Sequence, residues 1–231
     1  MKTVGIIGGL GPESTIEYYR LILAGYREQR PDAGNPPIVI NSINLPQLLS
    51  FMEAGELEKI AAYLTDEIHR LAEAKCSFAV LSANMPHIVF DQVQLQSPIP
   101  LISIVEVTCE VAKQMGFKKL ALFGTRFVMQ GILYPKVFSR DGIELIVPSS
   151  EEQDYIHQIY FGELVNGVVL PETRQKLLAI LDRLRREQKI QGLILGGTEL
   201  SLIFREPTAL GLPILDTTRI HVNSIVAELL R

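Results

Sequence analysis

The sequence predicts an α/β protein made of two pseudo-symmetric α/β domains with mainly parallel sheets. Short, fully apolar runs typical of buried strands alternate with longer amphipathic segments along the chain. In addition, three segments of the first half have similar counterparts about 115 residues further on, in the same order. This repeat indicates a duplicated α/β half, and chance similarity between buried strands is the alternative explanation.

Each repeated segment contains an apolar run, and two of the three pairs end in glycine or polar residues. The pairs are Thr3–Gly9 with Lys119–Thr125, Phe78–His87 with Gly192–Glu199, and Ile99–Ile102 with Leu212–Leu215. Ligands of open parallel sheets bind beyond the carboxyl ends of the strands. We therefore expect an inter-domain cleft onto which these ends open.

The expected domains follow from the repeat. Residues 1–100 together with 207–231 should form the first domain, because the final helix could pack back on the first half. Residues 101–206 should form the second domain. Both boundaries are expectations from pattern alone.

Composition excludes several classes of function. The chain has 231 residues and a net charge of −4, so it lacks the basic character of a nucleic-acid-binding protein. No apolar run approaches the ~18 residues that a membrane span requires. The first residues lead directly into a strand without the regions of a signal peptide. We expect a cytoplasmic protein that binds neither nucleic acid nor membrane.

The first strand, at residues 4–7, leads into Gly8-Gly9-Leu10-Gly11-Pro12 and a helix over residues 13–27. A glycine turn before a helix N-terminus offers free N–H groups and a favourable dipole for an anion. The spacing matches neither the dinucleotide nor the P-loop pattern. A small carboxylate is therefore the expected ligand, and a purely structural turn is the alternative.

Further elements of the first half follow the same alternation. A strand over residues 36–43 contains Asn41 near its end, a long amphipathic helix covers 56–75, and a buried strand covers 78–81. A last strand, at residues 101–104, leads into a helix over 105–115.

The second half repeats this order. A strand ends at Gly124-Thr125, and a helix over residues 127–139 is expected to be interrupted by Pro135. A short strand at 143–147 precedes a helix over 151–163, on which His157 should face solvent. Further helices are expected from Pro171 and over residues 219–230.

The chain contains two cysteines, Cys76 and Cys109. Neither has the spacing of a metal ligand, and a structural disulfide is not expected in a cytosolic chain. Both are interpreted as buried small hydrophobic residues. We expect no metal and no other cofactor.

At several motifs the chain resembles the aspartate/glutamate racemase family, whose members are cofactor-independent. The resemblance covers the whole length and is carried by Gly5–Thr15, Ala83–His87, Phe123–Thr125 and Gly197–Glu199. It implies two pseudo-symmetric α/β domains with a cleft between them, an amino acid or similar small carboxylate as ligand, and a homodimer.

The family's mechanism uses two cysteines on opposite faces of the substrate's α-carbon. The matching positions in this sequence hold Ala83 and Gly197, which cannot carry a proton. Members that act on acidic amino acids place an arginine at the position of Leu48, and Met85 replaces a usual threonine. The resemblance therefore implies a neutral substrate and a reaction without the usual pair of thiols.

Glu199 and Thr198 are the candidate catalytic residues. A buried carboxylate can be tuned into a general base, but Glu199 could instead bind the substrate ammonium group. His87 is interpreted as a capping or supporting residue. The expected substrate-binding residues are Gly9, Leu10, Gly11, Asn41, Ala83, Asn84, Met85, Thr125, Gly197, Thr198 and Glu199.

Three functions remain open at this point. The first is an isomerase acting at the α-carbon of a small, neutral amino acid. The second is a lyase, decarboxylase or cyclase reaction on the same scaffold. The third is a catalytically silent protein that binds a small carboxylate, or a chain whose cysteines were replaced.

Overall fold

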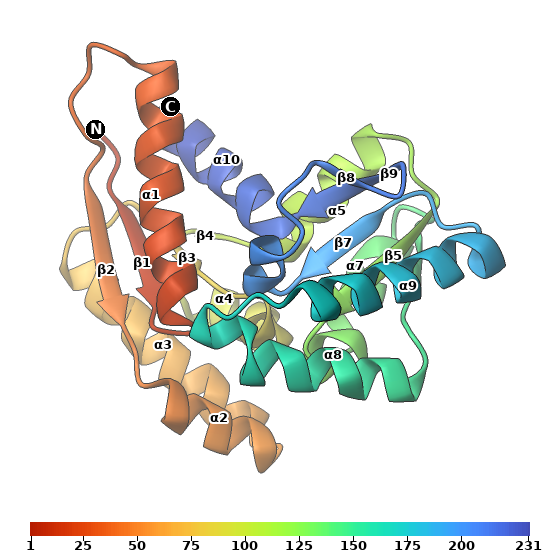
Figure 1. Ribbon diagram of the computed structural model, residues 1–231. Helices are drawn as coiled ribbons and strands as arrows, with labels where there is room; N and C mark the ends of the chain where they lie inside the picture. Colours follow the sequence, from red (N-terminus) through yellow and green to blue (C-terminus); the bar gives the residue numbers. More distant parts are fainter. The chain divides into compact units, whose positions relative to one another are not determined.

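The computed structural model describes residues 1–231 as two compact units. The first unit comprises Met1–Ile104 and His221–Arg231, and the second unit comprises Val105–Ile220. Each unit has its own sheet of mainly parallel strands with helices packed on it (Figure 1). The predicted α/β class with two α/β domains is therefore confirmed.

The units divide at positions that differ from the expected boundaries. Strand β9 (Leu212–Asp216) pairs in parallel with β7 (Leu193–Gly196), so residues 207–220 lie in the second unit. At the other boundary the first unit extends to Ile104, just beyond the last strand of its sheet. Helix α10 (Thr217–Leu229) begins in the second unit and continues in the first.

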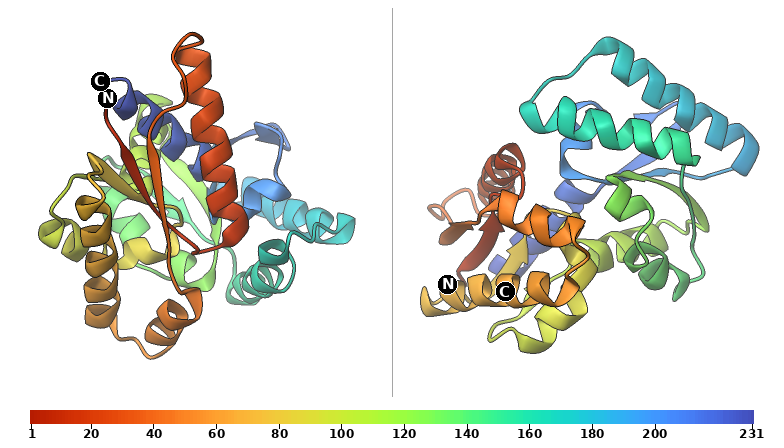
Figure 2. Two further views of the ribbon diagram at one scale, coloured as in Figure 1. Left: turned by 90° about the vertical axis from the view of Figure 1, so that its left-hand side faces the viewer. Right: turned by 90° about the horizontal axis from the view of Figure 1, so that it is seen from below.

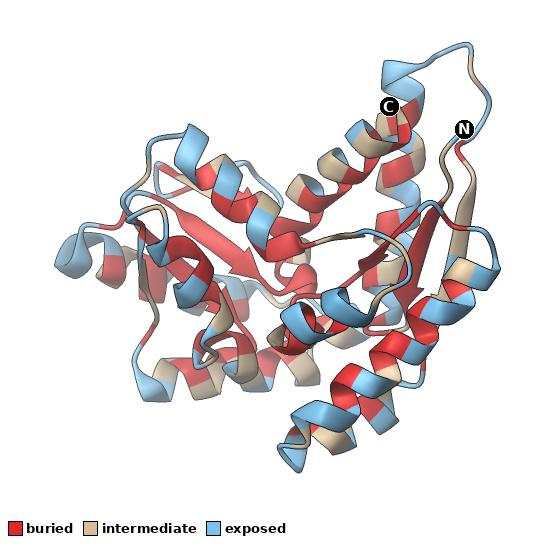
Figure 3. Cartoon of the chain, turned by 180° about the vertical axis from the view of Figure 1, so that it is seen from behind, coloured by how far each residue is buried: buried red, intermediate tan, exposed pale blue.

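The sheet of the first unit has the strand order β2-β1-β3-β4, and all its strands are parallel. The central strands consist of residues that are buried throughout, as expected for parallel strands covered on both faces. The edge strand β2 is less buried than the central strands, as the tan colour of its residues shows in Figure 3. The strands are β1 (Val4–Gly8), β2 (Ile38–Ser42), β3 (Phe78–Leu81) and β4 (Leu101–Ile102).

The helices of the first unit pack on this sheet through apolar stripes. Tyr18 and Ile22 of α1 and Val222 and Ile225 of α10 share one core cluster with the strand residue Ile6. The two chain ends lie close together in both views of Figure 2, where Lys2 forms an ion pair with Glu228. Besides α10, the helices are α1 (Pro12–Gln29), α2 (Leu45–Glu53), α3 (Leu57–Glu73), η1 (Met85–Val89) and α4 (Phe90–Gln96).

The sheet of the second unit has the order β6-β5-β7-β9-β8, and only the edge strand β8 runs antiparallel. Besides β7 and β9, its strands are β5 (Lys119–Gly124), β6 (Glu144–Ile146) and β8 (Thr208–Ala209). A core cluster joins Phe123 of β5 and Leu195 of β7 to Tyr160 and Leu181 of the covering helices.

Seven helical segments accompany this second sheet. They are α5 (Ile104–Gln114), α6 (Arg126–Met129), α7 (Leu133–Ser139), α8 (Ser150–Gly162), η2 (Leu164–Asn166), α9 (Pro171–Gln188) and η3 (Thr198–Leu202). None of the chain's helices is long and apolar enough to cross a membrane.

The two sheets share one strand order. The order β2-β1-β3-β4 of the first sheet corresponds strand by strand to β6-β5-β7-β9 of the second, and the second sheet has β8 as an additional edge strand. The segments paired in the sequence repeat fall on these equivalent strands. The repeat is therefore a repeat of topology and not a chance likeness of apolar runs.

Two local predictions were wrong. The helix expected over residues 127–139 breaks between Met129 and Leu133, whereas Pro135 lies in the first turn of α7. Proline is tolerated there because the first-turn N–H groups have no partner within the helix. His157 is half-buried and not solvent-facing: its Nδ1 accepts a hydrogen bond from the Arg126 N–H at 3.2 Å, and its ring contacts Phe127 and Phe161.

Candidate functional site

In the first unit, the turn after β1 is held by its own hydrogen bonds. The Gly9 N–H donates to the Thr15 hydroxyl at 2.9 Å. Gly9 has a φ of +75°, and a Cβ there would lie 2.6 Å from the Ile43 carbonyl oxygen, so glycine is required. Leu10 and Gly11 are buried and lead into α1. The N–H of Gly9, expected to bind an anion, is thus already engaged.

Hydrogen bonds also fix the segment after β3. The Ser14 hydroxyl donates to the Ser82 carbonyl at 2.8 Å, and the Ser82 hydroxyl donates to the Ile7 carbonyl at 3.0 Å. Ala83, Asn84 and Met85 follow, all nearly or fully buried. None of the side chains from Ser82 to Pro86 ionises near neutral pH.

His87 holds this segment in place through both nitrogens of its ring. Its Nδ1 lies 2.9 Å from the Ala83 carbonyl, and its Nε2 accepts the Ile104 N–H at 3.3 Å, so the neutral ring with the proton on Nδ1 satisfies both contacts. Burial lowers the pKa of His87 to about 3. The imidazole therefore connects the ends of β3 and β4, in agreement with the supporting role expected for it.

Asn41, near the end of β2, is anchored to α3. Its amide nitrogen donates to the Glu67 carboxylate at 2.7 Å and to the Glu67 carbonyl at 3.2 Å. That carboxylate is also paired with Arg70 at 2.8 Å. Glu67 is a buried acid, but these partners occupy it structurally.

In the second unit, a hydroxyl and a carboxylate follow β7 directly. Thr198 and Glu199 are both buried, and the Thr198 hydroxyl donates to Glu199 Oε2 at 2.7 Å. The preceding Gly197 is extended, with a φ of −154°, so its backbone could be adopted by any residue. These three residues lie together as predicted, although adjacency in sequence already ensures this.

Tyr160 of α8 joins this group and was missed by the sequence analysis. Its hydroxyl donates to the same Glu199 oxygen as Thr198 does. Burial, together with the neighbouring Glu199 carboxylate, raises the pKa of Tyr160 well above its usual value. No pattern in the sequence distinguishes Tyr160 from the other apolar-face residues of the helix.

Tyr160 also fills the space beside Gly197. A Cβ on residue 197 would lie 2.4 Å from Tyr160 Cε2 and 3.0 Å from both Cζ and the hydroxyl oxygen. Separations under 3 Å are far inside van der Waals contact, so no side chain fits at 197 while the ring stays in place.

Two buried hydroxyls follow the strands that neighbour β7 on either side. Thr125 directly follows β5, and Thr218 lies just beyond the end of β9, on either side of β7 in the sheet. Neither hydroxyl oxygen has a hydrogen-bond partner. Since buried polar groups are normally satisfied, these hydroxyls have capacity for a ligand. Thr218 was missed, although Asp216-Thr217-Thr218 visibly follows a predicted strand.

Both cysteines are buried, as expected. Cys76 precedes β3 at the far end of that strand, and burial raises the pKa of its thiol. Cys109 lies in α5, where burial and then the nearby Asp141 raise its pKa to about 11. Neither sulfur is a thiolate near neutral pH.

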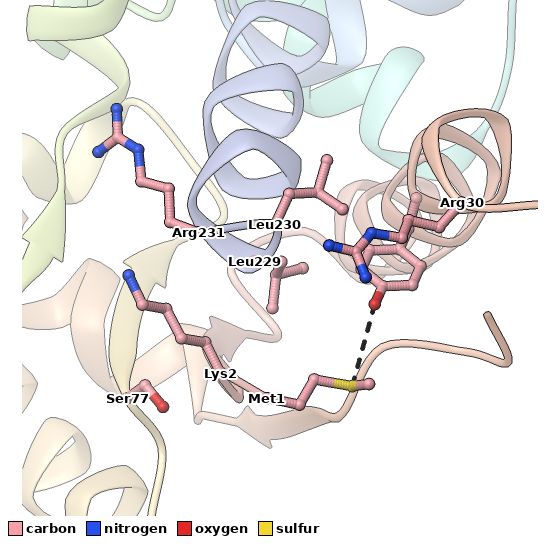
Figure 4. Close-up of a pocket in the computed structure, with 8 residues that line it drawn as sticks. Met1, Lys2, Arg30, Ser77, Leu229, Leu230 and Arg231 are labelled. Carbon is pink, nitrogen blue, oxygen red and sulfur yellow. Dashed lines mark hydrogen bonds between the residues drawn. The ribbon is translucent and has the colours of Figure 1, made fainter.

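No group of three or more histidine, cysteine, aspartate or glutamate side chains is placed to hold a metal ion. One pocket of about 380 Å³ lies at the other end of the first sheet, lined by Met1, Lys2 and Ser77, which precede the strands, and by Arg30 and Arg231 (Figure 4). It contains none of the predicted site residues.

The two units thus share the architecture of parallel α/β sheets, in which ligands bind beyond the carboxyl ends of the strands. The chain belongs to the Asp/Glu/hydantoin racemase family, whose model matches residues 7–225.

Individual relatives agree with this family. The broad-specificity amino-acid racemase RacX of Bacillus subtilis (strain 168) is 24% identical over 98% of both chains. Among solved structures, a candidate Asp/Glu racemase from Yersinia pestis is 29% identical with a TM-score of 0.91, over the whole of both chains. An aspartate racemase homologue from Pyrococcus horikoshii OT3 is 30% identical with a TM-score of 0.86, again over both whole chains.

Proposed function

We propose that the chain is an isomerase that acts at the α-carbon of a small, neutral amino acid. The observation that carries this proposal is the buried carboxylate of Glu199 at the end of β7, flanked by the unpartnered hydroxyls of Thr125 and Thr218. Glu199 would accept the α-proton, while the hydroxyls would bind the substrate carboxylate.

A neutral substrate is supported by the composition of α2. This helix has the sequence LPQLLSFME and contains no arginine, and Leu48 is fully buried in it. A second carboxylate on the substrate would therefore lack the bidentate guanidinium partner that acidic ligands favour. The relative RacX is named a broad-specificity amino-acid racemase, which is compatible with a substrate other than aspartate or glutamate.

The test is proton exchange at the α-carbon. Single enantiomers of neutral amino acids are incubated with the protein in D₂O, and α-deuteration and inversion are followed by NMR and chiral chromatography. Glu199→Gln should lower the rate of exchange at least ~100-fold. Glu151→Gln, which alters an exposed carboxylate on α8, is the matched control. Absence of exchange with every amino acid would refute the proposal.

A second function is favoured by one specific observation. The residues after β7 include an ionisable group, whereas those from Ser82 to Pro86 after β3 do not. A one-sided arrangement suits decarboxylation or elimination, in which a single proton is delivered or removed. Release of CO₂ or a new product mass without inversion would identify this reaction.

We also propose that the protein forms a homodimer, as is common in the family it resembles. Light scattering coupled to gel filtration measures the assembly mass directly. A mass near 25.8 kDa, that of one chain, would exclude it.

A further inference from the structure

Glycine is required at residue 197 because there is no space for a side chain, and not because the backbone conformation demands it. Its extended φ of −154° suits any residue. What excludes a side chain is the Tyr160 ring, which lies 2.4 Å from the place of a Cβ. The ring cannot easily move away, because it belongs to the core cluster of the second unit and its hydroxyl is held by Glu199.

The hydroxyl of Tyr160 therefore lies next to the position that a side chain at residue 197 would occupy. Its oxygen lies 3.0 Å from the place of that Cβ. A short polar side chain on residue 197 would bring its proton-carrying atom close to that Cβ. The phenol therefore supplies from α8 the kind of group that residue 197 cannot supply from the end of β7.

We propose that Tyr160 is a catalytic residue that relays the substrate's α-proton to Glu199. This inference rests on the proposed function, since it requires exchange at the α-carbon. In the forward step the Cα–H bond breaks and its electron pair remains on the carbon, delocalised into the substrate carboxyl group. The proton bonds to the Tyr160 oxygen while the phenolic proton passes to Glu199 Oε2. Reversal of both transfers returns a proton to the same face of the carbon, which gives exchange with retention, and inversion requires that a solvent water protonates the opposite face.

The contacts of Glu199 suit this relay. The carboxylate oxygen that accepts the phenolic hydrogen bond also accepts one from Thr198 at 2.7 Å, which holds it in place. Because burial and the Glu199 carboxylate raise the pKa of Tyr160, the resting phenol is protonated. It becomes a base only as its own proton moves to Glu199, so the two transfers are coupled.

The test compares two tyrosines of one helix. Tyr160→Phe keeps the ring and removes only the hydroxyl, and it should lower α-deuteration at least ~100-fold with unchanged thermal stability of the fold within a few degrees. Tyr155→Phe, on the same helix with its ring beside Lys176, should leave the rate within about threefold of the unmodified protein, far short of a general acid–base contribution.

A second measurement distinguishes proton transfer from a structural role. Site-specific replacement of Tyr160 by a fluorinated tyrosine makes the phenol more acidic without removing it. The relay predicts a changed rate and a pH profile displaced toward lower pH, which a merely structural ring would not produce.

The outcomes separate the two proposals. If the unmodified protein exchanges α-protons and Tyr160→Phe does so at a similar rate, the relay is refuted while the proposed function stands. If the unmodified protein exchanges none, the proposed function is refuted and the relay with it.

Discussion

The two units share a strand order but differ in the residues that follow the third strand of that order. After β3 the chain presents Ala83, held by the buried His87, and no ionisable side chain up to Pro86. After the equivalent β7 it presents Glu199, joined by Tyr160 from another helix. A duplicated scaffold can thus keep its strand order while its two copies take on unlike chemistry.

The largest expected difference between the two units is the loss of stability at low pH. Burial lowers the pKa of His87 to about 3 and that of His221 to about 4, from about 6.5 in the unfolded chain. Below pH 6.5 the unfolded chain therefore binds two protons that the folded first unit does not. Its free energy of unfolding should fall with pH down to about 4, by roughly 2–3 kcal/mol per pH unit.

Hydrogen exchange at pH 7 and pH 5, corrected for intrinsic rates, measures this loss unit by unit. The second unit contains only the half-buried His157 and should lose less protection. His69→Gln removes an exposed imidazole from the first unit and serves as the control. Equal losses in both units would contradict this assignment.

Ala83 carries a Cβ and Gly197 does not, and adding one methyl group at residue 197 tests why. Gly197→Ala forces a Cβ into the Tyr160 ring, and such overpacking should lower the free energy of unfolding by about 2–3 kcal/mol. In a Tyr160→Leu background the same change should cost clearly less. Urea unfolding of the four proteins gives the coupling energy.

Gly162 is the matched control for this cycle. It lies at the end of α8, and a Cβ there meets nothing within 4 Å. Gly162→Ala should therefore be neutral or slightly stabilising. Additive effects of Gly197→Ala and Tyr160→Leu would show that the ring does not fill the place of the missing side chain.

The smallest expected effects concern unpartnered hydroxyls, which occur in both units. Thr65 of α3 lies in the first unit, and Thr125 and Thr218 lie in the second. Valine at any of the three should raise the free energy of unfolding by about 1 kcal/mol, because a buried unsatisfied hydroxyl is removed. Thr173→Val should lower it by a similar amount, since that hydroxyl donates to Glu163 at 2.7 Å.

Ligand binding separates these threonines. Thermal stabilisation by a bound amino acid should weaken for Thr125→Val and Thr218→Val but not for Thr65→Val, because Thr65 lies in the first unit and does not follow a strand of the second sheet. Equal ligand response in all three variants would remove Thr125 and Thr218 from the binding site.

The sequence predicted the fold well because buried parallel strands leave a strong local signal. The runs around Ile6, Val80, Leu122 and Ile194 are each apolar throughout, and each is a central strand. The residues that follow those strands could also be located, because parallel strands place their carboxyl ends on one edge.

Contacts between distant segments left no such signal. Tyr160 reaches Glu199 across the packing of α8 on the sheet, and only coordinates show that it occupies the place of a side chain at Gly197. The engagement of the Gly9 N–H by Thr15 was hidden for the same reason. The break near Gly131 was misplaced because Pro135 gave the more obvious signal.

Helix α10 has a consequence for the order in which the chain folds. Val222, Ile225 and Val226 belong to the core cluster of the first unit, and His221 pairs there with Tyr18 at 2.8 Å. The second unit ends at Ile220. During synthesis from the N-terminus, the unit that is begun first therefore stays incomplete until the last helix of the chain has been made.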